Sequence, residues 1–390
     1  MKPSDRSIKR NITMSEVAAH AGVSRATVSR LLNNRESDIK ITERTRQRVF
    51  DAIRELGYSP NRLAQGLVSR KKQVIGLSIP SFAPPDPSNP SWIDMHSTHI
   101  GKMVCGVQMV THQRRYDIHL FERYEYQNEG SIAADDPRLD FVDGMVYATP
   151  NPEYPHYENI LRSGLPLVFI GPNTLSLPVS SVSVDNTAVH QEITRCLVQA
   201  GHTRIGLLLA EPFQAPLSQL RLAGYQQALM AHGLPFCENY VLAGSFDVSH
   251  MQACARQIFE VRPAPTALII GRPDFALHVA REMQRLKLRS PADVEVVVYG
   301  DDHAFEHMSP RLTAFDVTQQ LLAEQATCML FDELNGLAPS GRHLTLSGRL
   351  RIRDSSPMTG FFLEETPVTN IETAATTKGG VIGPNAVPIA

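Results

Sequence analysis

The pattern of hydrophobic positions changes near residue 72. Before that point, short stretches between about residues 13 and 56 carry apolar residues three or four positions apart, which is the spacing of one helical face. After residue 73, continuous runs of Val, Ile and Leu alternate with longer amphipathic stretches. The pattern predicts a small segment of three short helices, followed by a larger body of alternating strands and helices.

The first two predicted helices are joined by a tight turn. Thr13 and Glu16 have the spacing of a capping box, and Gly22 stands where the first helix should end. Ser24 can cap the second helix, and a third helix is expected between Thr42 and Gly57. Two helices joined in this way form a helix-turn-helix.

The second predicted helix has distinct inner and outer faces. Val28 and Leu31–Leu32 are spaced to pack inward. Arginine can donate two hydrogen bonds to guanine in a major groove, and small residues allow the helix to approach closely. The residues that would then point outward are Arg25, Ala26, Ser29 and Arg30.

The body has the pattern of a protein with buried parallel sheets. Continuous apolar strands that alternate with helices favour parallel strands with right-handed crossovers, and the length suits two lobes. Ligands of such folds bind at the carboxyl ends of strands, here in the cleft between the lobes. The predicted strands are Val74–Ile79, Phe141–Ala148, Leu167–Ile170, Ile205–Ala210, Ala267–Gly271 and Val294–Gly300. The predicted helices are Ala188–Ala200, Gln219–His232, Met251–Phe259, Phe275–Leu288 and Leu321–Leu334.

Composition narrows the class of protein. The chain has 390 residues, 42% of them hydrophobic and 20% charged, which excludes collagen-like, coiled-coil and wholly disordered proteins. No apolar run reaches the roughly 18–20 residues of a membrane span, and the polar, basic first ten residues do not resemble a secretory signal. The five cysteines are widely spaced without a CxxC pair, as expected of buried thiols in a reducing compartment. We therefore expect a soluble intracellular protein.

Charge is divided unequally between the two parts. Residues 1–72 contain 16 Lys and Arg and 7 Asp and Glu, a net charge of +9, whereas the remaining residues contain 22 and 33, a net charge of -11. A basic head on an acidic body indicates a head that binds a polyanion. From charge alone, a solvated basic tail is an equal alternative.

Catalysis has little support in the sequence. There is no GxSxG, HExxH, P-loop or GxGxxG motif. Asp301 and Asp302 are adjacent along the chain, and such neighbours rarely share a face. The candidate histidines lack metal-ligand spacing; they are His99, His112, His119, His303 and His307. We expect no enzymatic activity, no cofactor and no metal.

The head resembles the lactose-repressor (LacI/GalR) family of regulators. The resemblance rests on Met14–Ala18, Gly22–Arg30, Thr45–Asn61 and the segment Ala64–Leu67, and it extends more loosely to about residue 356. It implies a homodimer whose paired recognition helices enter the major grooves of a near-palindromic operator in double-stranded DNA. The residues expected to contact DNA are Thr13, Ser24, Arg25, Ala26, Thr27, Ser29, Arg30, Asn33, Asn61, Gln65 and Leu67.

The segment after Tyr58 is expected to be a marginal hinge helix. Pro60 suits the first position of a helix, but Gly66 costs about 1 kcal/mol of helix propensity. The family resemblance implies that Leu67 enters the minor groove and kinks the DNA. Packing of Leu67 against the body is the alternative.

The resemblance also implies a ligand site between the lobes, reached by three crossovers near Ser180–Asp185, Gly300–Asp302 and Thr313–Thr318. The segment Ser218–Tyr225 is similar to the family segment whose arginine, here Arg221, points into the cleft, where it could bind hydroxyls or a carboxylate. Phe246 matches an aromatic residue that stacks on ligand rings, and Asp301 belongs to a strand-end signature. A surface arginine and a core phenylalanine are the alternatives.

The sequence departs from the family where an Asn-Asp pair usually follows the fifth strand. Here the residues are Gly271-Arg272-Pro273-Asp274, and Arg272 brings positive charge to the strand end. This favours an anionic effector, although a structural Arg272–Asp274 pair is an equal alternative. The proline-rich loop Pro80–Trp92 is expected to be non-helical, with Ser81, Phe82 and Trp92 lining a lid or lying on the surface.

These features predict a small all-α helix-turn-helix head and a two-lobed α/β body of parallel sheets, like periplasmic binding proteins. The predicted parts are the DNA-binding domain 1–58, the hinge 59–72, the effector-binding and dimerisation domain 73–356 and a disordered tail 357–390. We expect a sequence-specific transcriptional regulator, a repressor, in the bacterial cytoplasm at the nucleoid. Its effector would be a sugar, sugar acid or sugar phosphate. The alternative is a ligand-binding protein with a non-specific, architectural DNA-binding head.

Overall fold

The chain consists of two compact units, Met1–Lys72 and Gln73–Ala390. The computed structural model describes residues 12–32, 41–58, 71–81, 91–124, 136–150, 156–174, 177–209, 211–244, 248–362 and 371–373. The described part of the first unit contains the helices α1 (Met14–Ala21), α2 (Arg25–Leu32) and α3 (Glu43–Leu56). They enclose a small apolar core around Val17, Val28 and Val49, each fully buried.

The second unit is built on two sheets, each of which forms a lobe. The first sheet has the order β13-β11-β5-β4-β3-β1-β2, and all its pairings are parallel except that of β13 with β11. Its strands are β1 (Val74–Ser81), β2 (Asp117–Tyr124), β3 (Gly144–Ala148), β4 (Leu167–Ile170), β5 (Ser180–Val184), β11 (Arg342–Leu346) and β13 (Ile371–Thr373).

The second sheet has the order β12-β10-β9-β8-β6-β7, and only the pairing of β12 with β10 is antiparallel. Its strands are β6 (Ile205–Leu209), β7 (Val241–Ala243), β8 (Ala267–Ile270), β9 (Glu295–Tyr299), β10 (Thr313–Asp316) and β12 (Arg349–Arg351). The two parallel sheets and the helical head confirm the predicted fold class.

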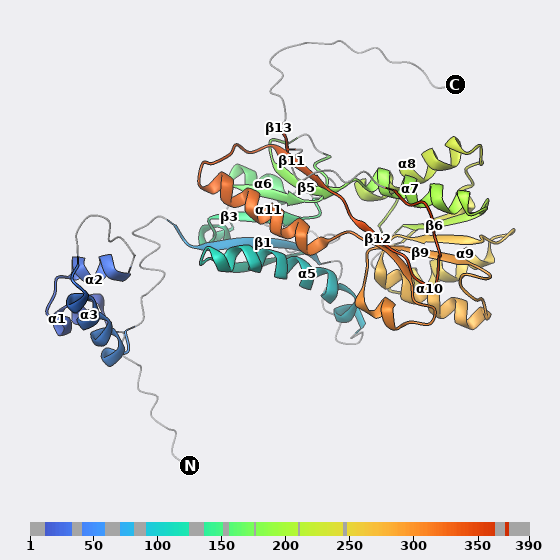
Figure 1. The fold of residues 1–390 in the computed structure, drawn as a ribbon. Coiled ribbons are helices and arrows are strands. Elements are labelled where there is room, and N and C mark those ends of the chain that lie inside the picture. The colour runs from blue at the N-terminus through green and yellow to red at the C-terminus, as the bar shows by residue number, and fades with distance from the viewer. Residues whose placement is uncertain are drawn as a thin grey trace, which may run out of the picture. The chain divides into compact units, whose positions relative to one another are not determined.

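Helices cover both sheets (Figure 1). In the first lobe, α5 and α11 pack against each other, and in the second lobe α7 and α8 lie on one side of the sheet while α9 and α10 lie on the other. The helices of the body are α5 (Ser91–Gln113), α6 (His156–Arg162), α7 (Asn186–Gln199), α8 (Pro216–Ala231), α9 (Val248–Glu260), α10 (Pro273–Leu286) and α11 (Gln319–Leu334). Short 3-10 helices are η1 (Pro137–Phe141), η2 (Glu238–Tyr240) and η3 (His303–His307).

The strand β3 shows why the central strands are apolar on both faces. Met145 and Tyr147 belong to a cluster of aromatic and aliphatic side chains on one face, whereas Val146 and Ala148 belong to the larger core on the other. All five residues of β3 are buried. Successive side chains of a strand point to opposite faces, so a strand that is buried on both sides cannot alternate apolar and polar residues.

The chain passes from one sheet to the other after β5, β10 and β11, and once more between β12 and β13. It leaves the first sheet after β5, returns after β10 to α11, and passes again between β11 and β12 at Ser347–Gly348. A Cβ atom at Gly348 would lie 2.3 Å from the Phe315 ring, so this passage requires glycine. The crossover expected near Gly300–Asp302 was wrong, because β9 and β10 are neighbouring strands of the same sheet.

The segments expected to be irregular are partly ordered. Strand β1 extends through Pro80 to Ser81, and α5 already begins at Ser91, so the loop predicted to reach Trp92 is shorter. Within the predicted tail, Met358 is only 3% exposed, and β13 pairs with β11. Part of the predicted tail therefore belongs to the folded body.

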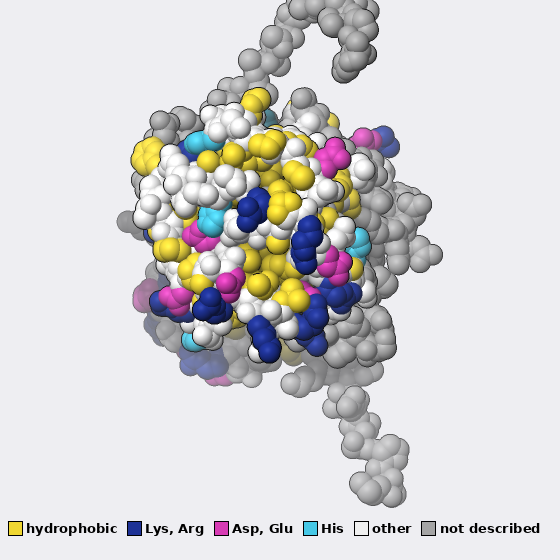
Figure 2. Space-filling view, turned by 90° about the vertical axis from the view of Figure 1, so that its right-hand side faces the viewer, with side chains coloured by type: hydrophobic (Ala, Val, Ile, Leu, Met, Phe, Trp, Pro, Cys, Tyr) yellow, Lys and Arg dark blue, Asp and Glu magenta, His cyan; other side chains and the backbone are white. Residues whose placement is uncertain are grey.

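None of the helices in the described residues is long and apolar enough to cross a membrane. Seen from the side of the second lobe, hydrophobic side chains occupy much of the middle of the surface, and many Lys and Arg side chains lie toward one edge (Figure 2). The large hydrophobic side chains that this lobe exposes include Phe213, Met230, Phe236, Leu277 and Leu286.

Candidate DNA interface and ligand site

The turn between α1 and α2 is built by the residues that the sequence indicated. The backbone N–H of Glu16 donates to Thr13 Oγ1 at 3.3 Å, and the backbone N–H of Thr13 donates to Glu16 Oε2 at 2.7 Å, which completes the capping box. Gly22 has the left-handed conformation, with φ 62°. Ser24 Oγ then accepts from the backbone N–H of Thr27 at 3.2 Å at the start of α2. Local hydrogen bonds therefore end one helix and begin the next within three residues.

The third helix fixes this turn. Arg48 Nη2 donates to the carbonyl oxygen of Gly22 at 3.1 Å, and His20 Nε2 lies 2.8 Å from Glu55 Oε2. Val28 and Leu31 of α2 are buried, at 0% and 4% exposure. The orientation of α2 is thus set by its apolar face and by contacts from α3 to the turn.

The opposite face of α2 is open. Arg25, Ala26 and Arg30 are exposed, and Thr27 and Ser29 are half-buried. This places a compact group of small, hydroxyl and guanidinium side chains on one side of a helix that is rigidly held, which is the arrangement that direct readout of bases requires. Asn33, Asn61, Gln65 and Leu67 lie outside the described residues.

The second candidate site lies at the carboxyl ends of β6, β8 and β9. Arg221 of α8 is buried, and its Nη1 donates to Glu211 Oε2 at 2.9 Å and to the carbonyl oxygen of Gly271 at 3.4 Å. Its Nε lies 3.3 Å from Asn186 Oδ1. The guanidinium carbon is 4.6 Å from the centre of the Tyr299 ring. The surface-arginine alternative is therefore excluded, since Arg221 joins segments from four parts of the chain.

A buried histidine lies at the base of this cluster. His190 is 0% exposed, its Nδ1 lies 2.9 Å from the carbonyl oxygen of Asn186, and its ring is 5.0 Å from that of Tyr299. Burial, followed by the charge of Arg221, lowers the pKa of His190 to about 3. Nε2 is buried without a hydrogen-bond partner among the described residues. Burial likewise raises the pKa of Tyr299 to about 12, so both groups are neutral near pH 7.

His190 should make the stability of the body depend on pH. Because its pKa is depressed in the folded state, the unfolded chain binds a proton below pH 6.5 that the folded chain does not, and stability is lost as pH falls from about 6.5 toward about 3. In urea unfolding of the full chain between pH 6 and pH 5, we expect His190→Phe to remove up to about 1.4 kcal/mol per pH unit of this loss. The exposed His112→Phe is the control, and an unaltered pH slope in His190→Phe would contradict the assignment.

The other predicted ligand residues are engaged elsewhere. Arg272 donates to both carboxylate oxygens of Asp274, so the structural pair is present and neither charge is isolated at the strand end. Asp301 accepts from Arg353 Nη1 and Nη2, both at 2.9 Å, and also contacts Arg351 Nε at 3.2 Å. Asp301 thus holds the end of β12 and the residues that follow it.

The side chains of three further predicted ligand residues lie outside the described part of the structure. Phe82 and Phe246 lie outside the described residues, and Ser81 ends β1 with a side chain that is not described. Conversely, sequence reasoning missed Glu211, Asn186, His190 and Tyr299 as parts of the cluster. Glu211 had a usable signal, because it stands one residue beyond a strictly apolar predicted strand. Among the described residues, no group of three or more His, Cys, Asp or Glu side chains is gathered as a metal site.

Two family models match parts of the two units. Residues 13–61 match the family of bacterial regulatory proteins described as the lacI family, and residues 194–356 match the periplasmic binding protein-like domain. The second match contains the strands β6, β8 and β9 whose ends surround Arg221. The first match therefore includes the exposed face of α2, and the second includes Arg221 but begins after Asn186 and His190.

Related proteins align over nearly their whole length. The HTH-type transcriptional regulator CelR of Thermobifida fusca is 29% identical over 353 residues, covering 89% of this chain and 99% of the relative. Catabolite control protein A of Priestia megaterium is 24% identical over 347 residues, with coverage of 89% and 99%. The transcriptional repressor CytR of Escherichia coli K12 is 24% identical over 344 residues, with coverage of 88% and 96%. CelR and CytR are named as transcriptional regulators.

Solved structures agree with this relationship. The complex of the transcriptional regulator CelR with cellobiose aligns with a TM-score of 0.64 and 27% identity, covering 89% of this chain and 100% of that chain. The lac repressor dimer bound to operator and the anti-inducer ONPF aligns with a TM-score of 0.75 and 24% identity, with coverage of 90% and 100%, which supports the fold. With these relatives covered almost completely, the chain joins a head that matches the lacI family of bacterial regulatory proteins to a body that matches the periplasmic binding protein-like domain.

Proposed function

We propose that this protein is a sequence-specific repressor whose operator affinity is controlled by a small ligand, a sugar, sugar acid or sugar phosphate, bound between the lobes. The observation that carries the proposal is the open face of α2, where Arg25 and Arg30 are exposed on a helix fixed by its buried side. A helix held in this way can present its side chains to base edges in a major groove. Because the proposed target is operator DNA, we propose that the protein acts in the bacterial cytoplasm.

Control by ligand follows from linkage. A ligand that binds one relative orientation of the lobes more tightly than another shifts the population toward that orientation. The segment 59–72 joins the head to the body, so a change in the body can alter the order of this segment and with it the affinity for DNA. Asn61, Gln65 and Leu67 remain the proposed minor-groove contacts of this hinge.

The cluster around Arg221 supports a ligand site in the body. Arg221, Asn186 and Tyr299 come from different elements and converge at strand ends, which is where ligands of parallel α/β folds bind. The solved structure of CelR contains cellobiose, which makes cellobiose a reasonable first ligand to test on this chain.

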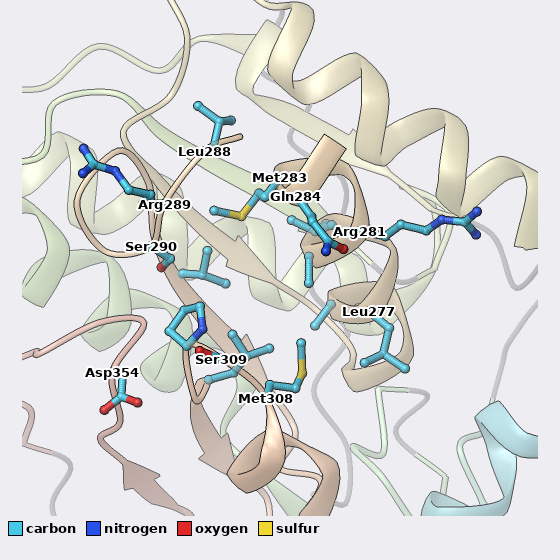
Figure 3. A pocket seen from close by; sticks show the side chains of 16 residues that line it. Leu277, Arg281, Met283, Gln284, Leu288, Arg289, Ser290, Met308, Ser309 and Asp354 are labelled. Carbon is cyan, nitrogen blue, oxygen red and sulfur yellow. The ribbon is translucent and has the colours of Figure 1, made fainter. Parts of the chain in front are cut away.

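We also propose that the active form is a homodimer, and that the outer face of α10 contributes to its interface. A hollow of about 740 Å³ lies between α10 and the segments that precede β9 and β10. Leu277, Met283, Leu288 and Met308 line it, while Arg281 and Arg289 point away from it on either side (Figure 3). Apolar surface with a basic rim, on a chain that must present two recognition helices to a palindrome, fits a second copy of this chain.

The first lobe also exposes large apolar side chains. Met109 of α5 and Leu120 of β2 are 49% and 50% exposed, and Leu277 of α10 is 44% exposed. Lys102 of α5 donates to the carbonyl oxygen of Asp301 in the second lobe at 2.8 Å, so α5 reaches from one lobe to the other. Both lobes can therefore take part in one interface, which is how dimerisation would sense their relative orientation.

Selection of bound sites from a random DNA library tests the function directly. The full chain should enrich a near-palindromic sequence, and residues 73–390 alone should enrich none. Binding by the full chain that varies only with salt, without enrichment, would instead favour a non-specific architectural head.

Arg30→Ala should weaken binding to the selected operator by roughly 1–3 kcal/mol and relax the base preference at one position in each half-site. The reason is that Arg30 lies on the exposed face of α2 and can donate two hydrogen bonds to one guanine. Operator titrations with all four bases at each position measure this. Arg54→Ala on α3, whose side chain is 77% exposed, is the matched control and should leave every base preference unchanged. A uniform loss across sequences in Arg30→Ala would assign Arg30 to phosphate.

A further inference from the structure

The arginine of the ligand site has an internal counter-ion. The side chains of Arg221 and Glu211 are only 6% and 14% exposed, and Nη1 lies 2.9 Å from Glu211 Oε2. Glu211 is the second residue after β6, and its carbonyl oxygen accepts from Ser218 Oγ at 3.0 Å, which ties the segment to the start of α8. The carboxylate is thus held beside the guanidinium by both its side chain and its backbone.

This pairing changes what Arg221 can recognise. A carboxylate or phosphate that approached the guanidinium would come within a few ångströms of Glu211 in a poorly solvated place, where repulsion between like charges is weakly screened. Glu211 Oε1 receives no hydrogen bond from the residues that the structure describes, so it remains an acceptor. A ligand hydroxyl can donate to a carboxylate and accept from a guanidinium, and it therefore fits the pair without a charge of its own.

Other arginines near these strand ends are also paired with carboxylates. Asp185 and Asp302 also follow strands of the parallel sheets, and both are N-cap residues. Arg272 is bound by Asp274, and Arg353 is bound by Asp301. An anionic ligand would thus meet arginines that already have carboxylate partners.

We propose that Glu211 makes this site selective for uncharged, hydroxyl-rich ligands and excludes sugar acids and sugar phosphates. The proposal rests on the ligand-controlled function proposed above and narrows its effector class. It reverses the expectation drawn from Arg272, because the carboxylate of Asp274 neutralises that residue locally.

The test uses the full chain and compares Glu211→Gln with wild type. Glutamine keeps the shape and one acceptor oxygen but removes the charge, so Arg221 becomes available to an anion. Calorimetric titration with inorganic phosphate at low ionic strength should show at least tenfold tighter binding to Glu211→Gln than to wild type. Glu211→Asp retains the charge and should resemble wild type, as should Glu238→Gln, which removes an exposed carboxylate elsewhere in the second lobe.

A second arm compares matched ligands. Glucose, gluconate and glucose 6-phosphate differ in charge on one scaffold, and neither anion should bind wild type more tightly than glucose does. The proposal is overturned if gluconate or glucose 6-phosphate binds wild type more tightly than glucose, or if Glu211→Gln gains no affinity for phosphate. Thermal unfolding of each variant verifies that the body is folded. Failure of the repressor function would appear separately, as a lack of operator enrichment in the DNA selection, which does not depend on Glu211.

Discussion

Replacing Gly224 with valine should destabilise the body by about 3 kcal/mol or more and abolish its ligand response. A Cβ atom at Gly224 would lie 2.1 Å from the carbonyl oxygen of Thr187 and 2.9 Å from the backbone nitrogen of Gln191. Both atoms belong to the backbone of α7, so they cannot move aside as a flexible side chain would, and α7 and α8 must separate. Arg221 lies one turn before Gly224 on α8, so its contact with Asn186 of α7 should be lost as well.

Urea unfolding of the full chain measures this effect. Gly101→Val is the matched control, because Gly101 is also helical but has no atom within 4 Å of a built Cβ. We expect the control to unfold close to the wild-type midpoint. If Gly224→Val and Gly101→Val unfolded at the same urea concentration, the close approach of α7 and α8 would be wrong.

Leu277→Asp should dissociate the proposed dimer and reduce operator affinity by about 100-fold or more. Leu277 is 44% exposed at the edge of the hollow on α10, so a charge there should leave the monomer folded but should oppose burial against a second copy. A monomer contacts only one half-site of the operator. Linking two heads in a dimer makes the second contact intramolecular and typically raises affinity by about 10² to 10⁴, and a monomer lacks this gain.

Sedimentation and operator titration together test this result. Met230→Asp makes the same kind of change at a residue that is 76% exposed on α8 and does not line the hollow, so it should leave both mass and affinity unchanged. If the Leu277→Asp protein remained dimeric, the proposal that α10 contributes to the interface would be wrong. If the wild-type protein were a monomer and still bound the full operator tightly, the proposal that DNA binding requires dimerisation would be wrong.

The local structure of the head was largely predictable. The capping box at Thr13, the left-handed Gly22 and Gly57 and the cap at Thr42 all formed as expected. Each of these features depends on hydrogen bonds or backbone conformations within about four residues, so neighbouring residues suffice to specify them. The strand Leu167–Ile170 was predicted with its observed bounds for a related reason: it is buried on both faces and therefore wholly apolar.

Elements whose character depends on distant neighbours were missed. Strand β5 has the sequence Ser-Ser-Val-Ser-Val, yet Ser180 and Ser181 are buried because Glu333 and His343 accept or share their hydrogen bonds. Strand β2 lies at an edge of the sheet and exposes Leu120, so it lacks a continuous apolar run. The residues that bury β5 and the strand that pairs with β2 are distant in sequence. Hydrophobic periodicity therefore does not reveal either strand.

The sequence by itself determined the helix-turn-helix, the face of α2 that carries Arg25 and Arg30, and the parallel α/β character of the body. The tertiary structure decided which charges are available. It brought Glu211 to Arg221, closed Arg272 onto Asp274 and placed Asp301 on Arg353. Local turns and buried faces are encoded by short-range spacing, whereas the charge of a ligand site is a sum over side chains that only the folded chain brings within a few ångströms of each other.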